Sequence, residues 1–152
     1  MHDPALFQPV PTLILCDGLG CDGYVWKYLQ WALADRYRIV HLHYRGHGQT
    51  PLPADFGRVT VADFATDVLA VMDASETERA VVCGHSLGVQ VALETYRQGR
   101  ERCAGLVLIC GSYRNPLSTF KGKQTLGDML PLIQTAVSRV PRLVGAFWKR
   151  LL

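Results

Sequence analysis

Short apolar runs alternate with helical patterns along most of this chain, and this alternation limits the possible folds more than any other feature. Four runs have the length and composition of buried strands: Thr12–Cys16, Arg38–His43, Ala80–Cys83 and Cys103–Ile109. Three intervening segments have helical spacing: Tyr24–Leu33, Val61 to about Asp73, and Leu87–Arg97. Because such alternation requires crossover connections, we expect an α/β fold with a mostly parallel sheet and helices on both faces.

Two of these helices have recognisable signals. Thr60 and Asp63 have the spacing of a capping box, in which a hydroxyl and a carboxylate satisfy the free N–H groups of a helix start. The inward face of that helix is predicted to carry Val61, Phe64, Ala65, Val68 and Met72. The inward face of the first helix is predicted to carry Val25, Tyr28, Leu29 and Ala32.

Composition narrows the class of protein. The chain has 152 residues, is 49% hydrophobic and 19% charged, and has a formal net charge of +3. These values argue against disorder and fit one domain of ordinary size. So mild a basic excess is no footprint for nucleic acid, and the absence of an apolar run of membrane-spanning length argues against an integral membrane segment.

The five cysteines carry information about the compartment. Cys16, Cys83, Cys103 and Cys110 fall in apolar, strand-like runs, and Cys16 and Cys21 lack a second thiol pair at zinc spacing. We expect small buried thiols in a reducing compartment and no metal site. The first eleven residues carry no Lys or Arg and no long apolar stretch, so we expect no secretory signal and a cytoplasmic location.

The strongest chemical signal is Gly84-His85-Ser86-Leu87-Gly88, which lies between a predicted strand and a predicted helix. A nucleophile on such a sharp turn is strained, and its close neighbours must be glycine to avoid clashes. The Ser86 hydroxyl then projects above the sheet, and the Leu87 N–H can point at a developing oxyanion. The helix start favours negative charge at the same place.

On these residues the chain resembles the serine-nucleophile branch of the α/β-hydrolase superfamily, from about Thr12 to Ser112. Members carry a His-Gly turn whose next N–H completes the oxyanion hole. The matching stretch is Asp17-Gly18-Leu19-Gly20, so the resemblance assigns that donor to Leu19, with Gly18 as a motif residue. Asp17 stands where the family has His, and this carboxylate opposes oxyanion charge unless it points away or is paired.

A second family stretch also departs from the pattern. Members often have Asp-x-Arg-Gly-x-Gly-x-Ser after the next strand, and residues 43–50 follow it with His43 in place of the aspartate. The resemblance implies hydrolysis of a carboxylic ester, or a related acyl hydrolysis, through an acyl-enzyme on Ser86. It implies a small-molecule acyl substrate and no cofactor.

The remaining members of the triad are missing from the sequence. The family order is serine, acid, histidine, but no histidine follows Ser86. His85 adjoins the nucleophile and cannot readily turn back onto its hydroxyl. We interpret His41, His43 and His47 as structural rather than as a displaced base, and Asp128 has nothing that marks it as the acid.

The chain changes character after residue 114. Basic residues and apolar positions at helical spacing follow, typical of the first part of the cap that such enzymes insert. We therefore divide the chain into residues 1–114, the N-terminal part of a hydrolase core, and residues 115–152, an incomplete cap. We expect the chain to be an N-terminal fragment that is poorly active alone.

Two other functions stay open. Gly18, Gly20 and Gly23 form a literal G-x-G-x-x-G, which can receive a dinucleotide, but no acidic residue stands at the end of the next strand to bind a ribose. Alternatively the chain is a non-catalytic or partner-dependent α/β protein. In that case an unprotected sheet edge favours self-association, and the basic amphipathic tail suits an anionic membrane surface.

Overall fold

The described residues of the computed structural model, 10–52, 54 and 58–113, form a four-stranded parallel sheet. Its strands are β1 (Thr12–Cys16), β2 (Arg38–His41), β3 (Ala80–His85) and β4 (Cys103–Ile109). They lie in the order β2-β1-β3-β4, so the chain crosses over β1 on its way from β2 to β3. The predicted α/β fold is confirmed.

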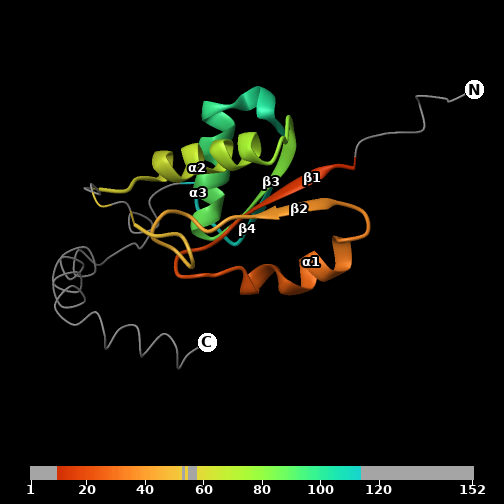
Figure 1. Ribbon diagram of the computed structural model, residues 1–152, viewed down its shortest axis with the longest axis horizontal. Coiled ribbons are helices and arrows are strands. Elements are labelled where there is room, and N and C mark those ends of the chain that lie inside the picture. The colour runs from red at the N-terminus through yellow and green to blue at the C-terminus, as the bar shows by residue number, and fades with distance from the viewer. Residues whose placement is uncertain (1–9, 53, 55–57, 114–152) are drawn as a thin grey trace, which may run out of the picture. The chain divides into compact units, whose positions relative to one another are not determined.

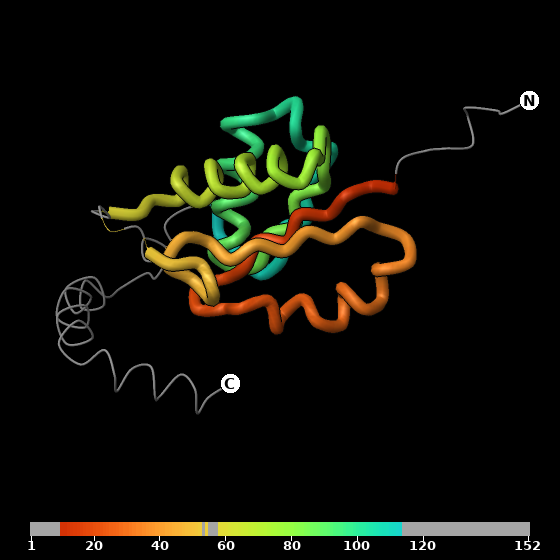
Figure 2. Tube along the Cα trace, in the orientation of Figure 1, coloured from red at the N-terminus to blue at the C-terminus, as the bar shows by residue number. Residues whose placement is uncertain are grey.

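Helices cover both faces of this sheet. The helices are the 3-10 turn η2 (Tyr24–Trp26), α1 (Lys27–Leu33), α2 (Val61–Ala74), α3 (Leu87–Gln98) and the 3-10 turn η3 (Arg100–Arg102). Figure 1 and Figure 2 show α1 on one side of the strands and α2 with α3 on the other. This double cover is the reason that the inner strands β1 and β3 are mainly apolar rather than alternating.

Strand β1 lies at the centre of the fold, and all five of its residues are buried. Leu13 and Leu15 pack with Trp26 on the α1 side. Ile14 and Cys16 pack on the opposite side, with side chains from α2 and α3. The two-residue period of a strand therefore divides β1 between two hydrophobic clusters.

Helix α2 begins as predicted. The Asp63 amide donates to Thr60 Oγ1 at 3.3 Å, and the Thr60 amide donates to Asp63 Oδ2 at 2.8 Å, so the capping box is confirmed. Phe64, Ala65, Val68 and Met72 are buried, and Val61 is half-buried at the edge of the same cluster.

The prediction for the inward face of the first helix is confirmed for two of its four residues. Val25 and Leu29 pack with Leu33 against the cluster that holds the buried Trp26. The prediction is wrong for Tyr28, which is 78% exposed, and for Ala32, which is also exposed. The segment begins with a 3-10 turn after Gly23, whose φ is +83°.

Two strands also differ in length from the prediction. Strand β2 ends at His41 rather than His43, because its partner β1 pairs only as far as Leu15 with His41. Strand β3 continues to His85, two residues beyond Cys83, because Gly84 and His85 still pair with Leu108 and Ile109 of β4.

Strand β4 lies at one edge of the described sheet, the kind of edge through which the sequence predicts self-association. Val107 and Leu108 are 42% and 46% exposed, and self-association through this edge stays a prediction. Within the part of the chain that the structure describes, no helix is long and apolar enough to cross a membrane. The predicted cap, residues 115–152, lies outside the described residues, as does Asp128.

Four of the five cysteines are buried, and all five are free. Cys110 departs from the prediction of burial: it follows β4 directly, in a left-handed conformation with φ +51°, and is exposed. Burial raises the pKa of the Cys16 thiol to about 12 and that of Cys83 to about 11.

These differences predict selective alkylation. At pH 8, iodoacetamide should modify Cys110 first in the native protein, because Cys16 and Cys83 are shielded and almost wholly in the thiol form. Peptide mass spectrometry after short exposures gives the order of modification. Equal labelling of Cys16 and Cys110 before denaturation would contradict the described core.

Candidate active site

The candidate site lies where the order of the strands along the sheet reverses. From β1 the chain runs through α1 to β2 on one side, whereas β3 lies on the other side of β1 and leads through α3 to β4. Because α1 and α3 cover opposite faces, the connections leaving β1 and β3 diverge. Such a switch point, at the carboxyl ends of parallel strands, is the usual ligand position in open α/β sheets.

Ser86 occupies this position in a strained conformation. Its φ is +54° and its ψ is −113°, a backbone conformation that residues other than glycine rarely adopt. Its amide donates to the Ile109 carbonyl at 3.0 Å, and its own carbonyl accepts from the Val89 amide at 3.1 Å. A strained residue of this kind costs about 1–3 kcal/mol and persists only where its surroundings fix it.

Three glycines let other backbone segments approach the turn from Gly84 to Gly88, which we call the elbow. A Cβ on Gly84 would lie 2.1 Å from the Gly88 carbonyl oxygen, and a Cβ on Gly88 would lie 2.0 Å from that of Cys16. A Cβ on Gly111 would lie 2.6 Å from the Ser86 carbonyl oxygen. The sequence pattern pointed to Gly84 and Gly88, but Gly111 was missed because it belongs to no local motif.

The turn after β1 lies against Ser86. The Cys21 amide donates to the Gly18 carbonyl at 3.2 Å, and Gly20 has φ +72°. A Cβ on Gly18 would lie 3.1 Å from the Ser86 Cβ, so these two residues are close neighbours. Leu19, on this turn, is 75% exposed. Leu87 is the first residue of α3, where an amide has no partner within the helix.

The carboxylate of Asp17 is buried beneath this turn and paired. Its Oδ1 accepts from the Trp26 indole Nε1 at 2.7 Å, and its Oδ2 accepts from the Gly23 amide at 2.9 Å. His41 Nε2 lies 2.8 Å from the same Oδ2. The carboxylate is therefore paired on both oxygens, which is the condition that the sequence set for a carboxylate near the proposed oxyanion.

Three described histidines that precede Ser86, namely His41, His43 and His47, have structural contacts. His41 bonds to Asp17, and its ring meets that of His43 edge-on at 5.1 Å. His43 Nδ1 accepts from the Gln49 amide at 3.2 Å. The His47 ring packs edge-on against Tyr44 and Phe64.

His85 is the last residue of β3 and directly precedes Ser86. Its ring meets the indole of Trp26 edge-on, with the ring centroids 6.3 Å apart. A Cβ on Gly18 would lie 3.1 Å from His85 Nδ1, so this ring supports the turn after β1 as well. The Nδ1 atom is buried and has no hydrogen-bond partner among the described residues.

The glycines of the G-x-G-x-x-G pattern do not present a free cradle. The Gly23 amide, which a phosphate would need, is already bound by the Asp17 carboxylate. The helix that follows begins as a 3-10 turn, and α1 itself has seven residues. Both features disfavour a dinucleotide. Within residues 10–52, 54 and 58–113, no three His, Cys, Asp or Glu side chains are grouped to hold a metal.

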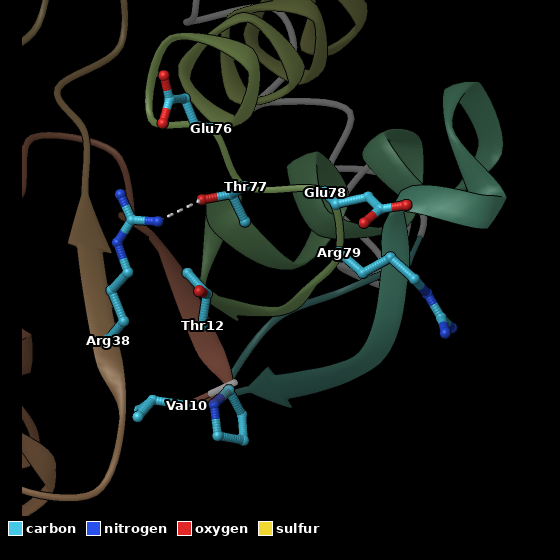
Figure 3. Close-up of a pocket in the computed structure, with 8 residues that line it drawn as sticks. Val10, Thr12, Arg38, Glu76, Thr77, Glu78 and Arg79 are labelled. Atoms are coloured by element: carbon cyan, nitrogen blue, oxygen red, sulfur yellow. Dashed lines mark hydrogen bonds between the residues drawn. The ribbon is translucent and has the colours of Figure 1, made fainter. Parts of the chain in front are cut away.

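A separate pocket lies at the opposite edge of the sheet, where the strands begin (Figure 3). There Arg38 Nη1 donates to Thr77 Oγ1 at 3.3 Å, and Arg38 Nη2 donates to the Ser75 carbonyl at 2.6 Å. These bonds join β2 to the segment before β3. The pocket contains none of the predicted site residues.

Comparison with known proteins agrees with the fold described above. The family model described as alpha/beta hydrolase fold matches residues 11–151. The protein belongs to the α/β-hydrolase fold family. A pimeloyl-[acyl-carrier protein] methyl ester esterase of Methylococcus capsulatus is 37% identical over 105 residues, which are 68% of this chain and 38% of that protein.

Solved structures give the same fold. The esterase RhEst1 from Rhodococcus is 30% identical with a TM-score of 0.60, over 66% of this chain and 38% of its own. An enol-lactonase from Burkholderia xenovorans has a TM-score of 0.66 at 22% identity, over 93% of this chain and 59% of its own, a likeness of fold alone. This α/β-hydrolase chain spans about two fifths of the length of the curated relatives it matches.

The glycine contacts predict which substitutions the elbow rejects. Gly88→Ala should lower the free energy of unfolding by about 2 kcal/mol or more, because its Cβ overlaps the Cys16 carbonyl. Gly105→Ala is the matched control, since its Cβ meets nothing closer than 3.8 Å. Urea denaturation measures both; equal stability of the two variants would contradict the elbow geometry.

Proposed function

We propose that this protein is a serine hydrolase that cleaves a carboxylic ester, or a related acyl bond, with Ser86 as nucleophile. The observation that carries the proposal is the strained backbone of Ser86, held between β3 and α3 at the switch point of the sheet. Strain of this kind concentrates at functional sites. Membership of a hydrolase family, and relatives named for ester hydrolysis, support the reaction class.

In the proposed reaction the Ser86 oxygen attacks the acyl carbon, the alcohol leaves and an acyl-enzyme forms. Water then releases the acid and restores the serine. The Leu87 and Leu19 amides are the proposed donors to the oxyanion, because Leu87 begins α3 and Leu19 lies on the turn beside Ser86. The strained turn explains why this serine is offered to a substrate.

The proton-transfer residues are proposed to come from outside this sequence. No histidine follows Ser86, and the histidines before it that Asp17, Gln49 and the Tyr44 ring contact have structural partners. The chain spans about two fifths of its curated relatives, which leaves room for a base and an acid in the remainder. The four buried free thiols fit a reducing compartment, so a cytoplasmic location belongs to the proposal.

Two variants of Ser86 separate reactivity from stability. Ser86→Ala and Ser86→Gly should both abolish modification by a fluorophosphonate, because the attacking oxygen is lost. Ser86→Gly should be at least as stable as Ser86→Ala, since glycine tolerates φ +54°. Intact-mass spectrometry and urea denaturation measure the two effects. Undiminished modification of Ser86→Ala would reject the nucleophile.

The pH dependence tests the missing base. In the 152-residue chain, the rate of fluorophosphonate modification should rise with pH without levelling off near about 6.5, the ordinary pKa of histidine. A plateau there that disappears in His41→Gln or His43→Gln would show that the chain carries its own base and would contradict this part of the proposal.

A further inference from the structure

We propose that Asp17 is a positioning residue that fixes the turn Gly18–Cys21 against Ser86, with Trp26 and His41 as its partners. The inference rests on the proposed function, because that turn carries one of the two proposed oxyanion donors. Asp17 touches no reacting atom in this account. It acts by holding the Leu19 amide at a fixed place.

A hydrogen bond of Asp17 spans the whole loop from Gly18 to Gly23. The residue leaves β1 immediately before Gly18, and its Oδ2 accepts from the Gly23 amide at 2.9 Å. One carboxylate therefore joins the start of the loop to its end, six residues later. Within that loop the Cys21 amide donates to the Gly18 carbonyl at 3.2 Å. This bond and the one from the Gly23 amide to Asp17 together close the loop that carries the exposed Leu19.

The other contacts of Asp17 fix it to rigid parts of the fold. The Trp26 indole, which donates to Oδ1, is 2% exposed and belongs to the cluster beneath β1 and β3. His41, on β2, supplies the second partner of Oδ2. The Tyr44 hydroxyl donates to the Asp17 backbone carbonyl at 3.3 Å. The carboxylate is thus bound from a helical turn, a neighbouring strand and its own loop.

His85 links this arrangement to the nucleophile. Its ring contacts Trp26, and both its Nδ1 and the Ser86 Cβ would lie 3.1 Å from a Cβ on Gly18. A shift of Asp17 or Trp26 would therefore move the turn relative to Ser86. Misplacement by about an ångström can reduce a rate by about a hundredfold, which gives positioning here a measurable effect.

Substitution of Asp17 tests the inference. Asp17→Asn replaces one acceptor oxygen by an NH2 group, which cannot accept a hydrogen bond. The asparagine therefore loses either the bond from the Trp26 indole or the bond from the Gly23 amide. We expect the maximal rate of Ser86 modification by a fluorophosphonate to fall by about tenfold to a hundredfold. The half-saturating probe concentration should not change, because the oxyanion donor acts only in the transition state.

A second readout does not need a reactive serine. The Cys21 amide bonds within the turn and not to Asp17, so its hydrogen exchange reports whether the turn is still formed. Exchange at this amide, measured by NMR, should be faster in Asp17→Asn than in the original chain. If Ser86 of the original chain resists the probe even at high pH, that result counts against the proposed function alone, and the exchange experiment still decides the role of Asp17.

Milder variants keep the test decisive if Asp17→Asn fails to fold. Trp26→Phe removes the bond to Oδ1 and part of the buried ring, keeps both acceptor oxygens of Asp17, and should cause a smaller loss of rate in the same direction. His41→Gln keeps a donor near the position of Nε2 and should retain more of the rate than His41→Leu. Asp73→Asn is the control, since that carboxylate pairs with Arg102 on the exposed side of α2.

The contrary result is clear. If folded Asp17→Asn and Trp26→Phe have lower melting temperatures but unchanged maximal rates and unchanged exchange at Cys21, then Asp17 only stabilises the fold. The inference would then be wrong. Equal rates for His41→Gln and His41→Leu would remove His41 from the arrangement.

Discussion

The arrangement depends on the contact between the start of α3 and the end of β1. Gly88 lies so close to the Cys16 carbonyl that no side chain fits between them, and Gly84 meets Gly88 in the same way. These contacts bring a helix start directly beside the carboxyl end of the neighbouring strand. Ser86 takes its strained backbone conformation as the chain makes this approach, and the turn Gly18–Cys21 becomes its neighbour for the same reason.

Electrostatics complete the arrangement. An unpaired carboxylate near a developing oxyanion would be unfavourable, yet Asp17 is buried with partners on both oxygens. The two departures from the family pattern noted in the sequence are connected here. Asp17 bonds to His41, and the ring of His41 contacts that of His43, so the two positions lie in one contact network.

Much of the fold could be predicted because its signals are local. The strand–helix alternation, the capping box of Thr60 and Asp63, and the buried face of α2 follow from periodicity and short-range hydrogen bonding. The glycines of the elbow were predictable because their spacing along the chain reflects a backbone clash. The fluorophosphonate experiments test the reactivity that these patterns predict for Ser86, and the alkylation experiment tests the burial of the cysteines.

What could not be predicted depends on contacts between distant segments. The helical spacing predicts Tyr28 in the core, yet Tyr28 is exposed, because spacing alone does not say on which flank of Val25 and Leu29 the buried face continues. The pairing of Asp17 with His41 joins the residue that follows β1 to the last residue of β2, 24 positions along the chain. Gly111 serves the elbow from beyond β4, where no motif marks it. Each case requires the sheet order before the local sequence can be interpreted.

The most direct test of the account is the site of acyl transfer. The protein would be exposed for an extended time at high pH, where hydroxide can replace the absent base, to p-nitrophenyl acetate. It would then be quenched in acid and digested, and the peptides examined for an added acetyl group by mass spectrometry. The account predicts the acetyl group on Ser86, with no adduct there in Ser86→Ala. Acetylation confined to lysine or cysteine side chains, equal in both proteins, would contradict it.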